Sequence, residues 1–123
     1  MTLTDDVEVA AQLGGLESAW EDGLGDAYAF YRARSAPPVA LAAALVESAL
    51  SLQHLGERTP APPELLVGDL CLARASRLLA DEGDQALQVA FAAAVERTAA
   101  AAAGGPPARP LRDLLLDAIE GAR

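Results

Sequence analysis

The sequence contains no lysine, one cysteine and one histidine, and aromatic residues make up only 4% of its 123 residues. A single cysteine, Cys71, excludes an internal disulfide and a cysteine-rich zinc site. Hydrophobic residues nevertheless account for 52% of the chain and are mostly alanine, leucine and valine. This composition suits closely approaching helices better than a sheet built on β-branched and aromatic side chains. We therefore predict an all-α fold, a compact bundle of about five to six helices.

Basic residues are few, and the formal net charge is -9. Because affinity for nucleic acid rests mainly on clustered lysine and arginine, DNA and RNA are not expected as partners. Acidic side chains are concentrated before the first arginine, Arg32, and we interpret them as a solvated face. They are Asp5, Asp6, Glu8, Glu17, Glu21, Asp22 and Asp26.

Long apolar runs are also missing. Charged residues such as Glu47, Asp69 and Arg74 interrupt every apolar stretch well before the ~20 residues that a membrane-spanning helix needs. The acidic start, Thr4 to Asp6, lacks the basic and apolar regions of a signal peptide. With an unpaired cysteine, these features predict a cytoplasmic protein without a membrane span.

Glycine and proline divide the chain into intervals that we interpret as helices of a single domain, 1–123. Residues 1–36 form acidic N-terminal helices, residues 37–103 the main helices, and residues 104–123 a Gly/Pro linker followed by an amphipathic helix. Thr4 is expected to cap a first helix that stops at Gly14. Between Leu16 and Ala33 the glycines allow either one kinked helix or two.

Four further helices follow from cap signals and apolar spacing. They run from Pro38 to Leu55, from Pro63 to Gly83, from Asp84 to Ala103 and from Pro110 to Glu120. The helix that starts at Pro63 has so few polar positions that we expect it to be covered on more than one side, as a central or interfacial helix. In the last helix, Arg112, Asp113 and Asp117 are assigned to the solvated side.

One segment resembles a known family. The stretch from Leu65 to Ala80, LLVGDLCLARASRLLA, is similar to the Gly-Asp helix that follows the first aspartate-rich motif of the trans-type polyprenyl diphosphate synthases. Upstream, the segment from Ala44 to His54 is similar to the family helix that leads into that motif, and the order of the two segments agrees. The resemblance covers residues 40–98, and it implies that the bundle is part of an isoprenoid-synthase-like helical core.

The chain departs from this family where the chemistry would occur. Prenyl transfer needs two aspartate-rich clusters that hold magnesium against the diphosphate. The first cluster should stand at 54–58, where the residues are His54-Leu55-Gly56-Glu57-Arg58, with a single carboxylate. Asp113 and Asp117 do not form a second cluster. We therefore predict no catalytic residue, no metal site and no cofactor, and no enzymatic activity of the chain alone.

In the resembled family the Gly-Asp helix lies at the subunit interface, and some heteromeric members pair a catalytic subunit with a small partner that lacks the aspartate-rich motifs. The resemblance therefore implies a non-catalytic subunit or regulator in isoprenoid biosynthesis. Its partner would be a second copy or a catalytic prenyl diphosphate synthase. The predicted interface residues are Leu65, Leu66, Leu70, Leu72, Ala73 and Arg77.

Two alternatives remain open at this point. The chain could be a self-contained helical dimerisation or interaction module whose likeness to the synthases is accidental. It could also carry an apolar, prenyl-like ligand, which would require a cavity that a sequence does not show.

Overall fold

A computed structural model describes residues 15–52 and 61–121 of the chain. These residues form helices and no strand, and five of the helices have eight residues or more, which confirms the all-α prediction. The elements are α2 (Glu17–Ala19), η1 (Trp20–Leu24), α3 (Gly25–Arg32), α4 (Pro37–Leu52), α5 (Pro62–Glu82), α6 (Gln85–Ala102) and α7 (Leu111–Gly121). The predicted helix after Thr4 lies outside the described residues.

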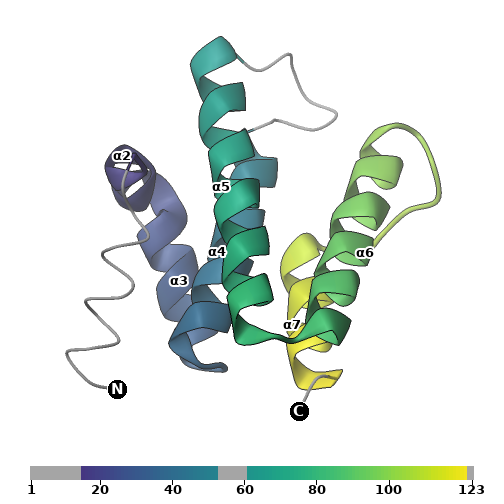
Figure 1. Cartoon of the computed structure of the whole chain (residues 1–123). Coiled ribbons are helices and arrows are strands. Elements are labelled where there is room, and N and C mark those ends of the chain that lie inside the picture. Colours follow the sequence, from purple (N-terminus) through teal and green to yellow (C-terminus); the bar gives the residue numbers. More distant parts are fainter. Residues whose placement is uncertain (1–14, 53–60, 122–123) are drawn as a thin grey trace.

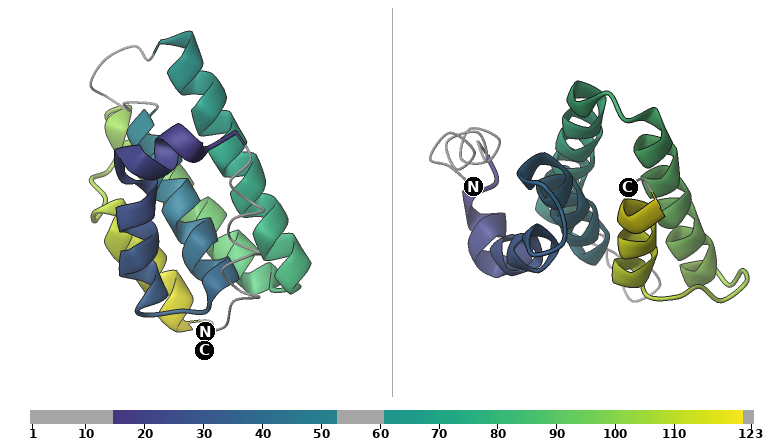
Figure 2. Two further views of the ribbon diagram at one scale, coloured as in Figure 1. Left: turned by 90° about the vertical axis from the view of Figure 1, so that its left-hand side faces the viewer. Right: turned by 90° about the horizontal axis from the view of Figure 1, so that it is seen from below.

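Helix α4 is the centre of the bundle. Figure 1 shows α5 in front of α4, with α2 and α3 on one side and α6 and α7 on the other, and the view from below in Figure 2 shows the same order. Every residue from Ala40 to Val46 is buried, so this helix is covered around its whole circumference. Its alanines allow neighbouring helices to approach closely, as dense packing of a small core requires.

Helix α5 was expected to be central or interfacial, and the first of these alternatives is wrong. Its buried residues, Gly68, Cys71, Ala75, Leu78 and Leu79, all lie on the side that faces α4 and α6. Leu66 on the opposite side is 70% exposed. Apolar residues around the circumference of α5 do not make it central, because α4 occupies that position. An interfacial role of α5 stays a prediction.

Local signals set the ends of α5 and α6. Before α5 the backbone N–H of Ala61 donates to Glu64 Oε1 over 3.0 Å, and after it Gly83 has a φ of 72°, a left-handed conformation that glycine adopts without strain. Asp84 then caps α6 by accepting from the backbone N–H of Leu87 at 2.9 Å, as predicted. The observed start of α5 at Pro62 is one residue before the predicted one.

The region from Leu16 to Ala33 is helical on both sides of a kink at Gly23. Gly23 has a φ of 137° inside the η1 turn, and helical geometry continues on both sides of it. Such a φ is strained for any other residue, so glycine determines where the run bends. Because the backbone of Gly23 is not helical, the region consists of two helical segments that meet at this kink, which is the second of the two alternatives left open by the sequence.

A polar cluster joins α3, α4 and α7. Glu47 on α4 accepts two bonds from Arg112 on α7, with Nε–Oε1 at 2.9 Å and Nη2–Oε2 at 2.7 Å, and one from the Tyr31 hydroxyl of α3 at 2.8 Å. The Arg112 guanidinium also lies 4.1 Å from the centre of the Phe30 ring. Burial, followed by the bond to Glu47, raises the pKa of Tyr31 above its usual range. Arg112, assigned to the solvated side, is thus 41% exposed in its side chain and also bonded to Glu47 of the central helix, a contact that the sequence did not predict.

Candidate association surface on helix α5

The side of α5 that faces away from the core carries a continuous stripe of exposed residues. Leu66, Ala73 and Ala80 recur every seven residues, which places them along one side of an α-helix. Asp69 and Arg77 lie beside them, and all five are exposed. We call these five residues, Leu66, Asp69, Ala73, Arg77 and Ala80, the outer stripe.

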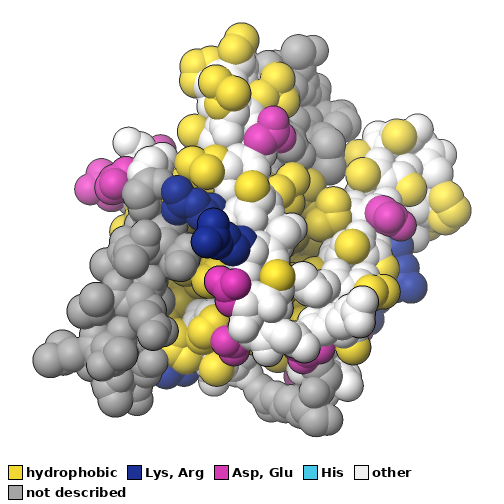
Figure 3. All heavy atoms as spheres, in the orientation of Figure 1, with side chains coloured by type: hydrophobic (Ala, Val, Ile, Leu, Met, Phe, Trp, Pro, Cys, Tyr) yellow, Lys and Arg dark blue, Asp and Glu magenta, His cyan; other side chains and the backbone are white. Residues whose placement is uncertain are grey.

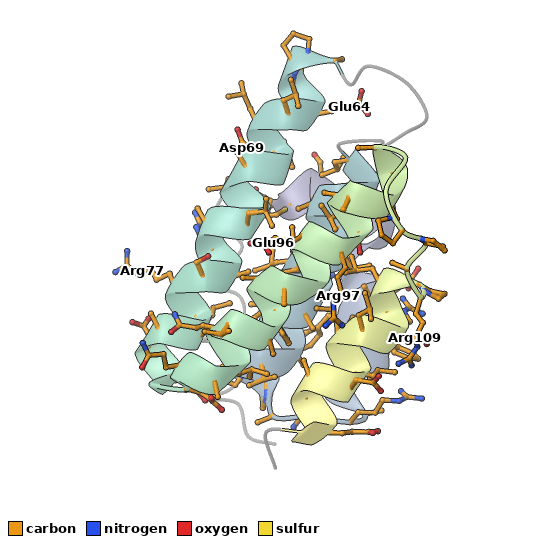
Figure 4. All side chains as sticks on the ribbon, turned by 90° about the vertical axis from the view of Figure 1, so that its right-hand side faces the viewer. Glu64, Asp69, Arg77, Glu96, Arg97 and Arg109 are labelled. Atoms are coloured by element: carbon orange, nitrogen blue, oxygen red, sulfur yellow. The ribbon has the colours of Figure 1, made fainter. Side chains whose placement is uncertain are left out.

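The outer stripe has a leucine at one end, and charged residues flank the alanine in its middle. Leu65 and Leu66, near the start of α5, are 40% and 70% exposed, and Figure 3 shows apolar side chains gathered at the upper end of this helix. Figure 4 shows Asp69 and Arg77 projecting from the same outer side of α5, away from α6 and α7. Leu66 is the most exposed large hydrophobic side chain in the described residues, which makes this side of α5 a candidate contact surface.

The structure separates the six predicted interface residues into three groups. Leu66, Ala73 and Arg77 belong to the outer stripe. Leu70 is half-buried and packs against the core. It also lies close to the turn at Gly15, since a Cβ atom added to that glycine would be 3.4 Å from Leu70 Cδ2. Leu72 lines a groove between α5 and α6, and Leu65, seven residues before it, lies on the same side of the helix and is 40% exposed. One helix face therefore does not contain all six.

Leu72 lines an apolar groove of about 350 Å³ between α5 and α6. Val46 of α4 and Phe91 of α6 also line it, and Ser76, Gln88 and Glu96 supply its polar side chains. The surface between these two helices is visibly hollowed in Figure 3. The groove is a place in the described residues where an apolar ligand would fit, so the carrier alternative stays open.

Two residues of the outer stripe, Asp69 and Ala80, were not predicted. From the sequence, Asp69 is identified as an interruption of an apolar run and as the aspartate of the Gly-Asp segment, and Ala80 as the end of that segment, but neither residue is assigned to the interface. The seven-residue spacing from Leu66 through Ala73 to Ala80 was present in the sequence and could have identified Ala80. The exposure of Asp69 on the same side follows from its place three residues after Leu66.

The single thiol is on the opposite, buried side of α5. Burial raises the pKa of Cys71 from 9.0 to about 11, against a smaller opposing effect of Arg74. A thiol protected in this way is a poor nucleophile, because the thiolate is the reactive form. Cys71 therefore belongs to the core, and it is no candidate for catalysis.

This raised pKa predicts a loss of stability in alkali. The unfolded chain releases the thiol proton at about pH 9 and the folded chain only at about pH 11, so the contribution of Cys71 is complete below pH 9 and is lost as the pH rises to 11. We expect a decrease of up to about 2 kcal/mol in the free energy of unfolding, measured by urea titration across this range. In a Cys71→Ala variant the decrease should be smaller, and an equal decrease in both proteins would contradict the assignment.

The described residues offer neither a metal cluster nor a membrane-spanning helix. In 15–52 and 61–121 no group of three or more His, Cys, Asp or Glu side chains could hold a metal ion. The segment from His54 to Arg58, where the first aspartate-rich cluster of the synthases would stand, lies outside these ranges. Within them, every helix is too short or too polar to cross a membrane.

Comparison with known proteins adds no relative. No family model, no curated protein and no solved structure matches the chain. The likeness to the polyprenyl diphosphate synthases therefore stays a prediction carried by the residues of the Gly-Asp segment. The exposed surface of α5 is the structural feature from which a function can be inferred.

Proposed function

We propose that this protein acts by helix-mediated association, as a non-catalytic polyprenyl-diphosphate-synthase-like subunit or regulator in isoprenoid biosynthesis. The observation that carries the proposal is the outer stripe of α5, where Leu66 is 70% exposed on the longest helix described. When a partner fully covers an exposed side chain of this size, its burial contributes about 1.5–3 kcal/mol to the free energy of association. The same helix contains the segment that resembles the Gly-Asp helix of the synthases.

The partner that this proposal implies is a catalytic prenyl diphosphate synthase. A subunit that contributes a helix face and no aspartate-rich cluster would stabilise the catalytic subunit or limit the length of its product by forming one wall of its pocket. Association through α5 leaves the α4 core intact, because the outer stripe faces away from it. Both roles therefore require only that the folded chain present this surface.

Substitution of Ala73 by glutamate tests the contact. Ala73 lies in the middle of the outer stripe, and a glutamate there would place an unpaired charge inside the interface. We expect the wild-type chain to co-purify with a co-expressed full-length synthase from the same genome, and Ala73→Glu to weaken binding at least about tenfold. Ala102→Glu, an equal change at an exposed position of α6, should leave binding unchanged.

Two results would contradict the proposed function. One is unchanged binding of Ala73→Glu, which would remove α5 from the contact. The other is prenyl transfer by the purified chain alone when it is supplied with magnesium and allylic diphosphates, because a non-catalytic subunit forms no product.

A further inference from the structure

We propose that the pocket at the connection between α6 and α7 binds a small organic molecule with one carboxylate on an apolar body, of the kind of a medium-chain fatty acid. The pocket has a volume of about 390 Å³, which lies within the usual range for small-molecule sites. Its residues come from α6, from the connection and from α7. The inference goes beyond the proposed function, because it concerns a different surface and a different kind of partner.

A close approach of the backbone at Gly105 brings the connection back against α6. The backbone N–H of Gly105 donates to the carbonyl oxygen of Ala100 over 2.8 Å. A Cβ atom added to Gly105 would lie only 2.8 Å from the same oxygen, so a larger residue does not fit at this position. The Gly/Pro linker expected from the sequence therefore turns tightly at the end of α6 and lines the pocket.

Most of the pocket lining is apolar. Pro106 and Pro107 contribute from the connection, and the fixed φ of proline makes this part of the lining rigid. Ala100 adds a small side chain from α6, and Leu114 of α7, 9% exposed, is the buried residue at the base. A lining that is already ordered reduces the entropy lost on binding, so an apolar body can bind here at a lower cost.

The charged side chains that line the pocket are two arginines. Arg97 comes from α6 and Arg109 from the connection, and Figure 4 shows both on the same side of the molecule. Arg109 donates from Nη1 to Asp117 Oδ2, and this ion pair balances its charge. Within 15–52 and 61–121, no hydrogen bond or ion pair joins the Arg97 side chain to another residue. The pocket therefore holds one positive charge without a counter-charge.

This single charge favours a ligand with a single negative charge. A guanidinium can donate in parallel to both oxygens of a carboxylate. The chain as a whole carries a net charge of -9, so it repels a dianion such as a phosphate monoester more strongly than a monoanion. A carboxylate bound to Arg97 leaves the attached hydrocarbon to pack against the prolines and Leu114. The chemistry of the lining thus points to an amphiphilic carboxylate.

Titration of octanoate into the full chain, followed by NMR, tests the site. We expect a dissociation constant of about 1 mM or lower, with shifts of the Arg97 Nε–H signal and of the Ala100 and Leu114 backbone amides. Acetate supplies the carboxylate alone and 1-octanol the apolar body alone, so each should bind at least about tenfold more weakly. Octyl phosphate at about pH 8, where it is a dianion, should also bind more weakly than octanoate.

Arg97→Gln tests the role of the charge. Because the Arg97 side chain is exposed, the variant should keep its fold, which circular dichroism checks. Its dissociation constant for octanoate should be at least about tenfold higher than that of the wild type. Arg97→Lys should restore part of the affinity, because lysine keeps the charge but lacks the planar pair of donors. Arg77→Gln, the same change at an exposed position of α5, should leave octanoate binding unchanged.

Four results would overturn the proposal. They are an absence of shifts at about 10 mM octanoate, equal affinity of the wild type and Arg97→Gln, tighter binding of octyl phosphate than of octanoate, and shifts confined to the groove beside Leu72. The third would assign the pocket to phosphate esters, and the fourth would place the ligand between α5 and α6. Since the pocket and the outer stripe share no residue, this inference and the proposed function can fail independently.

Discussion

We expect the Leu45→Ala variant to have a free energy of unfolding about 3 kcal/mol lower than the wild type. Leu45 is 0% exposed on α4, the helix that all other long helices surround. Removal of its side chain leaves a cavity that rigid helices on several sides cannot fill, so the lost burial and the cavity both lower stability. Urea denaturation followed by circular dichroism measures the difference, and an unchanged denaturant slope would show that the folded state has kept its compactness.

Leu66→Ala is the matched control, because it deletes the same atoms from the outer stripe. Leu66 is 70% exposed, so its removal should change the free energy of unfolding by less than about 0.5 kcal/mol while it weakens association through α5. The two substitutions thus separate the core from the contact surface. Equal losses of stability in the two variants would contradict the central position of α4.

The position of α4 could not be predicted from its residues. Its alanines are compatible with burial and with exposure alike. Alanine fits a close contact between helices, and an alanine exposed to water on a helix has little effect on stability. The spacing of its leucines predicts a helix but does not show how many of its faces are covered, whereas the structure buries the helix on all sides. For α5 the opposite error arose, because its larger leucines were interpreted as evidence that several faces are covered.

Features set by neighbouring residues were predicted better than those set by distant ones. The cap at Asp84 and the stop at Gly83 depend only on the next few residues. The pair between Arg112 and Glu47 joins residues 65 positions apart, and no local pattern indicates it. The candidate site shows the same limit, because α5 was identified from its own residues but the groove beside Leu72 depends on where α6 packs.

The second large effect is expected at the polar cluster that joins α3, α4 and α7. Glu47→Ala should lower the free energy of unfolding by about 2 kcal/mol. Most of this loss comes from Tyr31, whose hydroxyl donates to Glu47. The Tyr31 side chain is 0% exposed, so water cannot easily replace the carboxylate as the acceptor. The Arg112 side chain is 41% exposed, so its guanidinium can be hydrated when the carboxylate is removed, and its share is smaller.

A double-mutant cycle separates the two partners of Glu47. Tyr31→Phe alone should cost about 1 kcal/mol, and in the double variant with Glu47→Ala the loss should be smaller than the sum of the single losses by a similar amount, since no buried hydroxyl is left without an acceptor. The corresponding cycle with Arg112→Ala should show a weaker coupling. If the coupling to Arg112 is instead larger than the coupling to Tyr31, Glu47 chiefly holds α7, and not α3, against the central helix.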